Sequence, residues 1–277
     1  MAEIHQPGAS APFLVLCDMD GVLYRGHDPI EGASAAIGVL QSQGHAVCFA
    51  TNNGWTPVPE LVERLARMGI TTDEHHVVGA SWMAADLFHR TYPGAQRPFV
   101  VGGVELRRQL RQVGTRPVPS IQPDQADSLV VGLDLAFDYG RLARAQSVAL
   151  RGGPFVATDG DSAYPWKDGW MPGTGALLSA IETASHRTAV QAGKPEPHMY
   201  AELQRRMQWR GPTVVVGDNL NSDIAAGRRL GVPTILVLTG LATRQAVDDT
   251  DPGERPDHVI PSITAVPDVL KTLGNKR

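Results

Sequence analysis

A short apolar segment that stops abruptly at a carboxylate limits how this chain can fold more than any other feature of its sequence. Residues 13–17, Phe-Leu-Val-Leu-Cys, are all apolar and lie between Pro12 and Asp18. A continuous apolar run of this length is typical of a strand that is buried on both faces, as in a parallel sheet covered by helices. Acidic residues therefore begin at the point where the first predicted strand ends.

The segments after this strand alternate between helix and strand patterns. A helix pattern covers residues 33–43 and a strand pattern covers residues 46–50; a second helix pattern opens at the proline-rich residues 56–59 and closes at Gly69. Alternation of this kind predicts right-handed crossovers and a parallel sheet covered by helices. We therefore predict an α/β fold with a doubly wound, Rossmann-like core, in which ligands collect at the carboxyl ends of the strands.

Strand patterns recur in the middle of the chain and near its end, and the middle ones need not join the first sheet. They cover residues 99–101, 128–131, 155–157, 213–216 and 234–238. A helix pattern runs from Asp223 to Leu230. Residues 246–257, which are rich in Asp, Pro and Gly, predict a surface loop before a last short helix.

Length and charge exclude several classes of function. With 277 residues, the chain is long enough for two domains or for one domain with a large insertion. Its 25 basic and 29 acidic side chains give a net charge of -4, without a long run of either sign. We therefore expect neither nucleic acid nor a membrane as a partner.

The sequence also bears on the compartment in which the protein works. Residues 1–13 lack the basic and then apolar regions of a secretory signal, and no apolar stretch reaches the roughly 20 residues that cross a bilayer. Cys17 and Cys48 both lie in apolar runs, where a reduced thiol behaves as a small hydrophobe; a disulfide between them is the less favoured alternative. We expect a soluble, cytoplasmic protein with buried thiols.

Two carboxylates follow the first predicted strand at a spacing that suits catalysis. Asp18 and Asp20 are separated by one residue, and Gly21 then allows the chain to turn sharply. In this arrangement one carboxylate can act as a nucleophile while the other handles protons. Turns are rich in Asp and Gly for reasons of backbone geometry as well, so the pair alone is also consistent with an ordinary turn.

Three further segments strengthen the catalytic interpretation. Thr51 and Asn52 end the second predicted strand, where a hydroxyl and backbone amides can hold phosphate oxygens. Lys194 lies between glycine and proline and can present one positive charge between two anions. Asp218 ends another strand, and Asp223 follows five residues later, a spacing that is typical of a metal site.

Taken together and in this order, the four segments resemble the four motifs of the haloacid dehalogenase superfamily. Residues 18–24 (Asp-x-Asp-Gly-Val-Leu-Tyr), 51–53 (Thr-Asn-Asn), 100–103 and 172–177 are similar to the branch that contains NagD-type, 4-nitrophenyl, phosphoglycolate and pyridoxal phosphate phosphatases. The resemblance covers nearly the whole chain. It implies that an α/β cap domain of the C2 type is inserted between the second and third motifs of the core.

The length of the chain between these motifs agrees with such an insertion. Roughly 140 residues separate Thr51 from Lys194, which is far more than a loop needs and enough for a domain. We place the C2-type cap at residues 92–186 and the core at residues 1–91 and 187–277. The resemblance also implies that two copies of the chain can form a homodimer through the cap.

The resemblance assigns a role in phosphoryl transfer to each motif. Asp18 attacks phosphorus in line and is transiently phosphorylated, and Lys194 adds a fixed positive charge beside it. Asp20 protonates the leaving alkoxide and then acts as the base for the water that opens the aspartyl phosphate. Thr51 and Asn52 hold phosphate oxygens.

The same resemblance implies one Mg²⁺ ion per active site, which lets an anionic carboxylate approach an anionic phosphate. Its ligands are the carboxylates of Asp18 and Asp218 and the backbone carbonyl of Asp20. Asp223 either supports the metal or orients Lys194, and a helix-capping role is a third reading. Mn²⁺ or Co²⁺ can substitute, because an oxygen-rich site accepts several hard divalent ions.

The cap segment between residues 159 and 173 contains our candidates for substrate specificity. They are Asp161, Tyr164, Trp166 and Trp170. A dense group of aromatic and charged side chains suits a polar organic ligand with a flat or apolar face; alternatively, the tryptophans anchor the loop to the cap. Asp159 stands where relatives commonly carry Asn, which puts the choice of substrate in doubt. Trp55 either borders the substrate entrance or packs under the next helix.

We therefore expect magnesium-dependent hydrolysis of a small phosphomonoester, of the phosphoglycolate, glycerol phosphate, sugar phosphate or pyridoxal phosphate class. One rival is a phosphotransferase or phosphomutase on the same scaffold, which product analysis with added acceptors separates from a hydrolase. The other is a non-catalytic phosphometabolite-binding or receiver protein. Receivers are shorter and lack a domain-sized insertion, and turnover without a kinase partner would exclude this reading.

Overall fold

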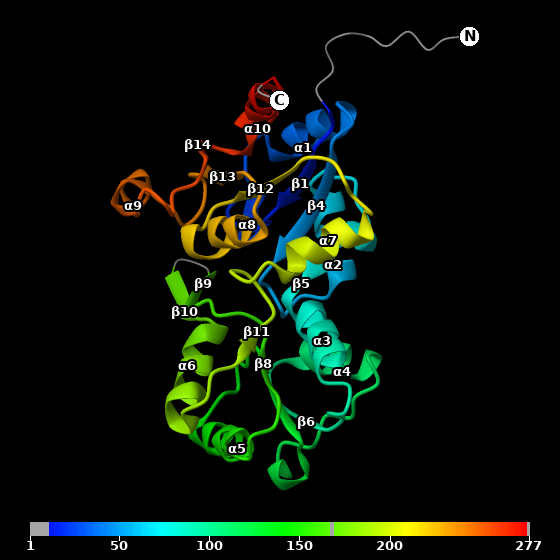
Figure 1. Cartoon of the computed structure of the whole chain (residues 1–277), viewed down its shortest axis with the longest axis vertical. Coiled ribbons are helices and arrows are strands. Elements are labelled where there is room, and N and C mark those ends of the chain that lie inside the picture. Colours follow the sequence, from blue (N-terminus) through cyan, green and yellow to red (C-terminus); the bar gives the residue numbers. More distant parts are fainter. Residues whose placement is uncertain (1–10, 167–168, 276–277) are drawn as a thin grey trace, which may run out of the picture.

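Two separate parallel sheets form the framework of the chain, as the computed structural model shows for residues 11–166 and 169–275 (Figure 1). The larger sheet belongs to the core and the smaller one to the inserted cap. In Figure 1 the core lies above the cap along the long axis of the molecule. The predicted α/β architecture with an inserted α/β domain is confirmed.

The core sheet has six parallel strands in the order β14-β13-β12-β1-β4-β5. Their bounds are β1 Leu14–Cys17, β4 Ala46–Thr51, β5 Val77–Gly79, β12 Thr213–Gly217, β13 Thr234–Val237 and β14 His258–Ile260. The first strand of the sequence is central, because β1 pairs with β12 on one side and with β4 on the other. Ligand sites of open parallel sheets lie beyond the carboxyl ends of such central strands.

The cap sheet has four parallel strands in the order β11-β8-β7-β6. Their bounds are β6 Pro98–Val101, β7 Ser128–Val131, β8 Phe155–Ala157 and β11 Val190–Gln191. Two antiparallel hairpins complete the strands: β2 Tyr24–Arg25 with β3 Asp28–Pro29, and β9 Ala163–Trp166 with β10 Gly169–Pro172. The middle strands therefore form a sheet of their own.

Helices cover both faces of the core sheet. Alternate residues of β1 point into different apolar clusters: Val15 packs with α1 (Ala33–Ser42), α2 (Val58–Arg67) and α10 (Val266–Gly274), whereas Leu16 packs with α3 (Ala80–Thr91), α7 (His198–Arg206) and α8 (Ala225–Leu230). The prediction of a strand buried on both faces is confirmed.

The cluster around Leu16 continues into the cap. It includes Leu106 and Leu110 of α4 (Val104–Gln112) and Val130 of the cap sheet. On the other face of the cap sheet, α5 (Tyr139–Leu150) and α6 (Thr174–Ser185) enclose a separate apolar cluster. One apolar core is therefore shared by the two domains near α3 and α4.

One local prediction is wrong in part, and a second, the helix over residues 223–230, is confirmed but begins earlier in the chain. The predicted loop at 246–257 begins with helix α9 (Arg244–Asp249), because the Thr243 side chain caps it by accepting a hydrogen bond from the Ala246 N–H and because Val247 is buried. The helix expected from Asp223 starts as a π-helical turn over Leu220–Ile224, capped by Asn219, and α8 begins only at Ala225.

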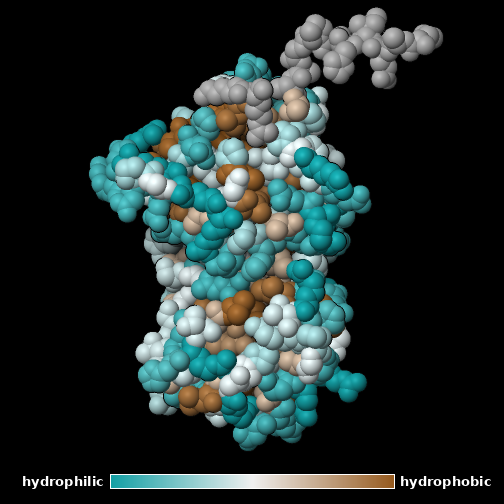
Figure 2. All heavy atoms as spheres, viewed as in Figure 1, coloured by the Kyte–Doolittle hydropathy of each residue, from teal (hydrophilic) through white to brown (hydrophobic). Residues whose placement is uncertain are grey.

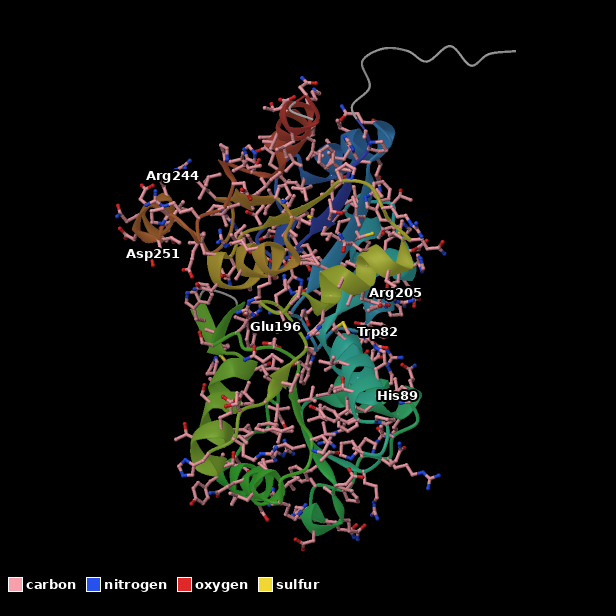
Figure 3. All side chains as sticks on the ribbon, viewed as in Figure 1. Trp82, His89, Glu196, Arg205, Arg244 and Asp251 are labelled. Atoms are coloured by element: carbon pink, nitrogen blue, oxygen red, sulfur yellow. The ribbon has the colours of Figure 1, made fainter. Side chains whose placement is uncertain are left out.

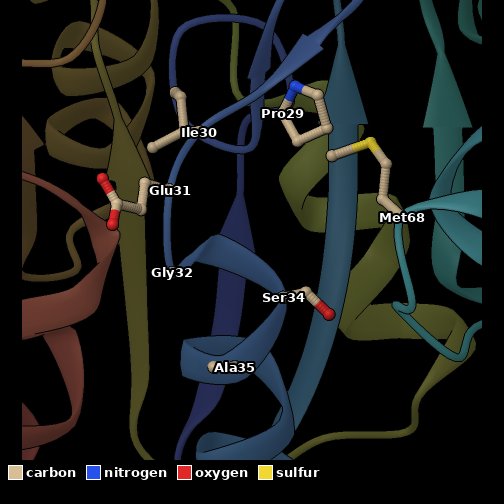
Figure 4. A pocket seen from close by; sticks show the side chains of 7 residues that line it. All are labelled: Pro29, Ile30, Glu31, Gly32, Ser34, Ala35 and Met68. Carbon is tan, nitrogen blue, oxygen red and sulfur yellow. The ribbon is translucent and has the colours of Figure 1, made fainter.

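Polar side chains cover most of the face in Figure 2, with hydrophobic residues in small groups between them. No helix in the two described ranges is long and apolar enough to cross a membrane. A surface pocket of about 480 Å³ lies between Pro29, Glu31 and Met68 (Figure 4), on residues other than the predicted catalytic ones.

Candidate active site

The predicted catalytic carboxylates meet at the carboxyl end of the core sheet. Asp18 directly follows β1 and Asp218 directly follows the adjacent strand β12, while Thr51 is the last residue of β4 on the other side of β1. The Asp18 N–H donates to the carbonyl of Val216 at 2.9 Å and so continues the pairing of the two strands. All three side chains are buried. The parallel topology thus assembles residues that are far apart in sequence.

Lys194 joins this group from another segment. Its Nζ donates hydrogen bonds to Oδ1 of Asp18 and, at 2.6 Å, to Oδ1 of Asp223. Lys194 is only 2% exposed. Burial disfavours its charged form, but the two carboxylates outweigh burial and raise the pKa of Lys194 well above its ordinary value. The lysine is therefore held as a cation between two acids, and its part in catalysis stays a prediction.

The site holds more negative than positive charge. Asp18, Asp218 and Asp223 each offer one carboxylate oxygen, and these oxygens all lie within 4.8 Å of one another. Burial and the other carboxylates raise the pKa of Asp18, against the opposing effect of Lys194. Burial and then Asp223 raise the pKa of Asp218 to about 7. Three buried carboxylates around one lysine fit a divalent cation with oxygen ligands.

The hydrogen bonds of Asp223 and Asp218 distinguish their roles. Asp223 accepts from Lys194 and from the Tyr200 hydroxyl (3.1 Å) at Oδ1, and from the Asn219 N–H (3.2 Å) at Oδ2. Asp218 accepts from the Leu241 N–H at Oδ2 (2.7 Å), which leaves Oδ1 available to a ligand. This geometry favours Asp223 as the residue that orients Lys194, one of the readings that the sequence left open.

Asp20 lies at the edge of the cluster and is half-buried. Burial raises its pKa, although the Gly26 and Gly21 amides and Arg64 oppose this effect. Gly21 has φ +78°, and a Cβ there would lie 2.4 Å from Oδ2 of Asp218. Only glycine fits this turn, because a side chain there would collide with Asp218. The carboxylate of Asp20 is not one of the three clustered above, and its backbone carbonyl as a metal ligand stays a prediction.

The second motif is tied to the lysine segment. The Asn52 side chain accepts from the Lys194 N–H at 3.0 Å through Oδ1, and its Nδ2 donates to the Lys194 carbonyl at 3.0 Å and to Oδ2 of Asp161 at 2.9 Å. Thr51 Oγ1 accepts from the Asn53 N–H at 3.1 Å. The amide of Asn52 is thus occupied by protein groups, and phosphate binding by Thr51 and Asn52 stays a prediction.

The cap candidates are not all in the same position. Asp161 reaches the core through Asn52, whereas Trp170 on β10 is 60% exposed. Tyr164 on β9 is half-buried and pairs across the hairpin with Met171. The side chain of Trp166 lies outside the described part of the structure. Asp161 thus connects the cap to Asn52 of the core by a hydrogen bond.

Some residues of the site had no signal in the sequence. Tyr200 and Leu241 reach Asp223 and Asp218 from distant segments, and only the folded chain brings them there. Trp55 borders the cap: a Cβ added to Gly103 of the cap would lie only 2.8 Å from the Trp55 ring. The loop 192–197, which carries Lys194 and also Glu196 (labelled in Figure 3), runs between cap and core.

Two family models match the chain, one described as haloacid dehalogenase-like hydrolase over residues 15–116 and one as HAD-hydrolase-like over residues 191–266. The glycerol-3-phosphate phosphatase of Gallus gallus is 33% identical, over 94% of this chain and 91% of that protein. Chronophin of Homo sapiens is 37% identical, over 82% of this chain and 81% of that protein.

Solved structures agree with these sequence matches. The crystal structure of glycerol phosphate phosphatase from Mycobacterium tuberculosis in complex with magnesium has a TM-score of 0.84 and 29% identity, and the match covers 91% of this chain and 75% of that one. Because the match covers 91% of this chain, it includes parts of both the core and the cap described above.

Proposed function

The chain belongs to the haloacid dehalogenase-like hydrolases and is a phosphatase, and we propose that it hydrolyses a small phosphomonoester through a phosphorylated Asp18. The observation that carries this proposal is the group of three buried carboxylates beside Lys194: Asp18 and Asp218 follow two adjacent strands, and Asp223 lies in the helical turn after the second strand. Its relatives include phosphatases named for glycerol phosphate. We accordingly favour an ester of the glycerol phosphate, sugar phosphate, phosphoglycolate or pyridoxal phosphate class.

Magnesium is the proposed cofactor, with Asp18, Asp218 and the backbone carbonyl of Asp20 as ligands and Asp223 beside them. When bound, the ion offsets the negative charge of the carboxylates and of the phosphate. The excess of carboxylates and the magnesium complex of a related phosphatase support this assignment. Mn²⁺ and Co²⁺ are proposed substitutes because the donor atoms are all oxygens.

The residues of the chain then divide the chemistry between them. An oxygen of Asp18 attacks phosphorus in line, and the bond to the leaving oxygen breaks. Lys194 keeps its proton and stabilises the negative charge that gathers on the phosphoryl oxygens. Asp20, half-buried and with a raised pKa, gives its proton to the leaving alkoxide. It then takes a proton from the water that releases phosphate from Asp18.

The cap is proposed to close the site over the leaving group. We place it at residues 92–186, with β11 as an additional edge strand of its sheet. Closure excludes water that would compete with the substrate and positions the organic part of the ester. Tyr164, Trp166 and Trp170 are the proposed contacts to that part, and a homodimer through the cap is a further proposal.

Release of phosphate from a panel of phosphate esters tests the proposed function. We expect release by the purified protein with Mg²⁺, none with a chelator, and a loss of at least about 1,000-fold in Asp18→Asn, because the amide is a poor nucleophile. Asp124→Asn, at an exposed position in the cap, serves as the matched control. Full activity of Asp18→Asn in a preparation free of host phosphatase would exclude Asp18 as the nucleophile.

The same assay separates hydrolysis from transfer. Added alcohols should not accept the phosphoryl group, so that the phosphate released equals the ester consumed. A phosphorylated alcohol as the main product would assign the chain to phosphotransfer instead. An intact protein that releases nothing from any ester would favour a binding role.

A further inference from the structure

The catalytic lysine stands at the end of a strand of the cap, although it serves the core. Strand β11 pairs with β8, with Val190 opposite Val156 and Gln191 opposite Ala157. The pairing continues beyond the strand: the Ala192 N–H donates to the Ala157 carbonyl at 2.9 Å, and the Gly193 N–H donates to the Thr158 carbonyl at 2.7 Å. The next residue is Lys194. Movement of the cap sheet therefore acts directly on the backbone of the lysine.

A single core side chain holds the peptide groups on both sides of Lys194. The Asn52 amide accepts from its N–H and donates to its carbonyl, at 3.0 Å each. Gly193 fits between the two domains only because it has no side chain: a Cβ would lie 2.6 Å from Oδ1 of Asn52 and 2.5 Å from the Thr158 carbonyl oxygen. The lysine backbone is thus held between Asn52 of the core and β8 of the cap.

Asp161 provides the remaining contact of this amide from the cap. A neutral amide nitrogen has two hydrogens, and Nδ2 of Asn52 gives one to the Lys194 carbonyl and one to Oδ2 of Asp161. An ionised carboxylate only accepts hydrogen bonds, so it fixes which end of the amide faces the cap. A rotated amide would place Oδ1 against the carboxylate and would lose both bonds to Lys194.

The cap holds Asp161 firmly enough for this task. The Asp161 N–H donates to Oδ1 of Asp159 at 3.2 Å, and its carbonyl accepts from the Gly175 N–H at 2.8 Å. Gly175, the second residue of α6, lies so close to the turn that a Cβ on it would be 2.2 Å from the Gly160 carbonyl oxygen. The turn that carries Asp161 therefore has little freedom to follow the core if the cap moves.

We propose that Asp161 is a positioning residue of the reaction: from the cap it orients the Asn52 amide, which in turn holds the backbone of Lys194. This inference rests on the proposed function. It means that the Asp161 carboxylate couples closure of the cap to catalysis in the core. With the cap in place, Lys194 Nζ lies between Asp18 and Asp223. With the cap displaced, Asn52 and Gly193 both lose partners, and the lysine loses its support.

Removal of the carboxylate should lower kcat and leave KM within about twofold, because the lysine acts on the phosphoryl group in the transition state. We expect a loss of about tenfold or more in Asp161→Ala, as for one charge-assisted hydrogen bond. Asp161→Asn should recover most of it, since its side-chain oxygen can still accept from Asn52. Ser162→Ala, at the exposed neighbouring position, should match the unchanged protein.

Two further comparisons separate positioning from contact with the substrate. The loss in Asp161→Ala should be the same for phosphate esters with different leaving groups; a loss that depends on the leaving group would make Asp161 a specificity residue and overturn the proposal. In addition, Asp161→Ala should cause no further loss of kcat in an Asn52→Ala background. Independent, additive losses would also overturn it.

If the wild-type protein has no phosphatase activity, the proposed function is refuted, but the contact between Asp161 and Asn52 can still be measured. A double-mutant cycle between Asp161→Ala and Asn52→Ala in urea unfolding reports the coupling of the two side chains without turnover. Coupling in unfolding together with coupling in kcat supports the positioning role. Absence of coupling in unfolding refutes the contact itself, whether or not the protein is a phosphatase.

Discussion

Buried charge is arranged differently at the strand ends of the core and of the cap. In the cap, Asp134 lies in the loop after β7, and both of its carboxylate oxygens accept hydrogen bonds from Nη1 of Arg141, at 2.6 Å each. The N–H groups of Gly102 and Ala136 also donate to this carboxylate. In the core, Asp18 and Asp223 share Lys194, and Asp218 has no basic side chain of its own among its recorded hydrogen bonds.

The two sheets have the same parallel topology, so topology alone does not make the core site catalytic. A balanced pair such as Asp134 and Arg141 satisfies its own charges and stabilises a loop. An unbalanced group of carboxylates is stable only if protons or a cation supply the missing charge. Both sheets have acids at their strand ends, but the core site alone of these two has more buried carboxylates than basic partners. We infer that this excess of buried carboxylates marks the reactive site.

Replacement of the core cation should have the largest effect. Lys194→Met leaves three buried carboxylates without a basic partner and removes the charge that faces the phosphoryl group. We expect kcat to fall at least about 100-fold and the free energy of unfolding without metal to fall by about 3 kcal/mol or more. Steady-state kinetics and urea unfolding measure the two losses. A kcat within tenfold of the unchanged protein would contradict the role of Lys194.

The matching change in the cap should separate stability from activity. Arg141→Met leaves Asp134 buried without its ion pair, and we expect the free energy of unfolding to fall by about 3 kcal/mol. This pair lies at the carboxyl ends of the cap strands, but its hydrogen bonds within the described residues go to other cap residues, so kcat should stay within about twofold when the folded fraction is taken into account. Urea unfolding and kinetics on the same preparation test this. A large loss of kcat would show that the balanced pair also serves the reaction.

Magnesium should stabilise the core and leave the cap pair unaffected. At a concentration of about 100 times its Kd, the ion should raise the free energy of unfolding by about 2.7 kcal/mol, because it binds the folded state alone. Thermal unfolding with and without Mg²⁺ measures the shift. Asp218→Asn should abolish it and Asp134→Asn should retain it. An equal shift in Asp218→Asn would place the ion elsewhere.

Much of the core could be predicted from the sequence because its strands are unambiguous. The apolar run 13–17 can satisfy its backbone and bury its side chains only inside a covered sheet, and the residue after it must then lie at a strand end. The same reasoning located Thr51 and Asp218. Sequential motifs therefore identified the residues that the parallel topology brings together.

Other parts of the site depend on packing that no local pattern encodes. The Tyr200 hydroxyl reaches Asp223 only because α7 packs against the same face as α8, and the Leu241 amide reaches Asp218 from the loop after β13. Helix α9 was missed because a single cap, Thr243, and one buried valine outweigh a polar composition. The use of the Asn52 amide by Lys194 and Asp161 was equally invisible, since these partners lie 142 and 109 residues away.

The smallest expected effect concerns Asp159, a cap acid that, among the described residues, has no basic partner of the kind that Asp134 has in Arg141. Burial, and then the nearby Asp161, raise the pKa of Asp159 to about 7. Between about pH 4 and pH 7 the unfolded chain loses this proton while the folded chain keeps it, so the free energy of unfolding falls as the pH rises. Asp159→Asn cannot ionise and should escape this loss. Its stability relative to the unchanged protein should therefore increase by roughly 2 kcal/mol between pH 5 and pH 8, as urea unfolding at the two pH values measures. A difference that is independent of pH would mean that the Thr158 and Thr174 hydrogen bonds already stabilise the ionised form, and Asp159 would then resemble the balanced acid of the cap.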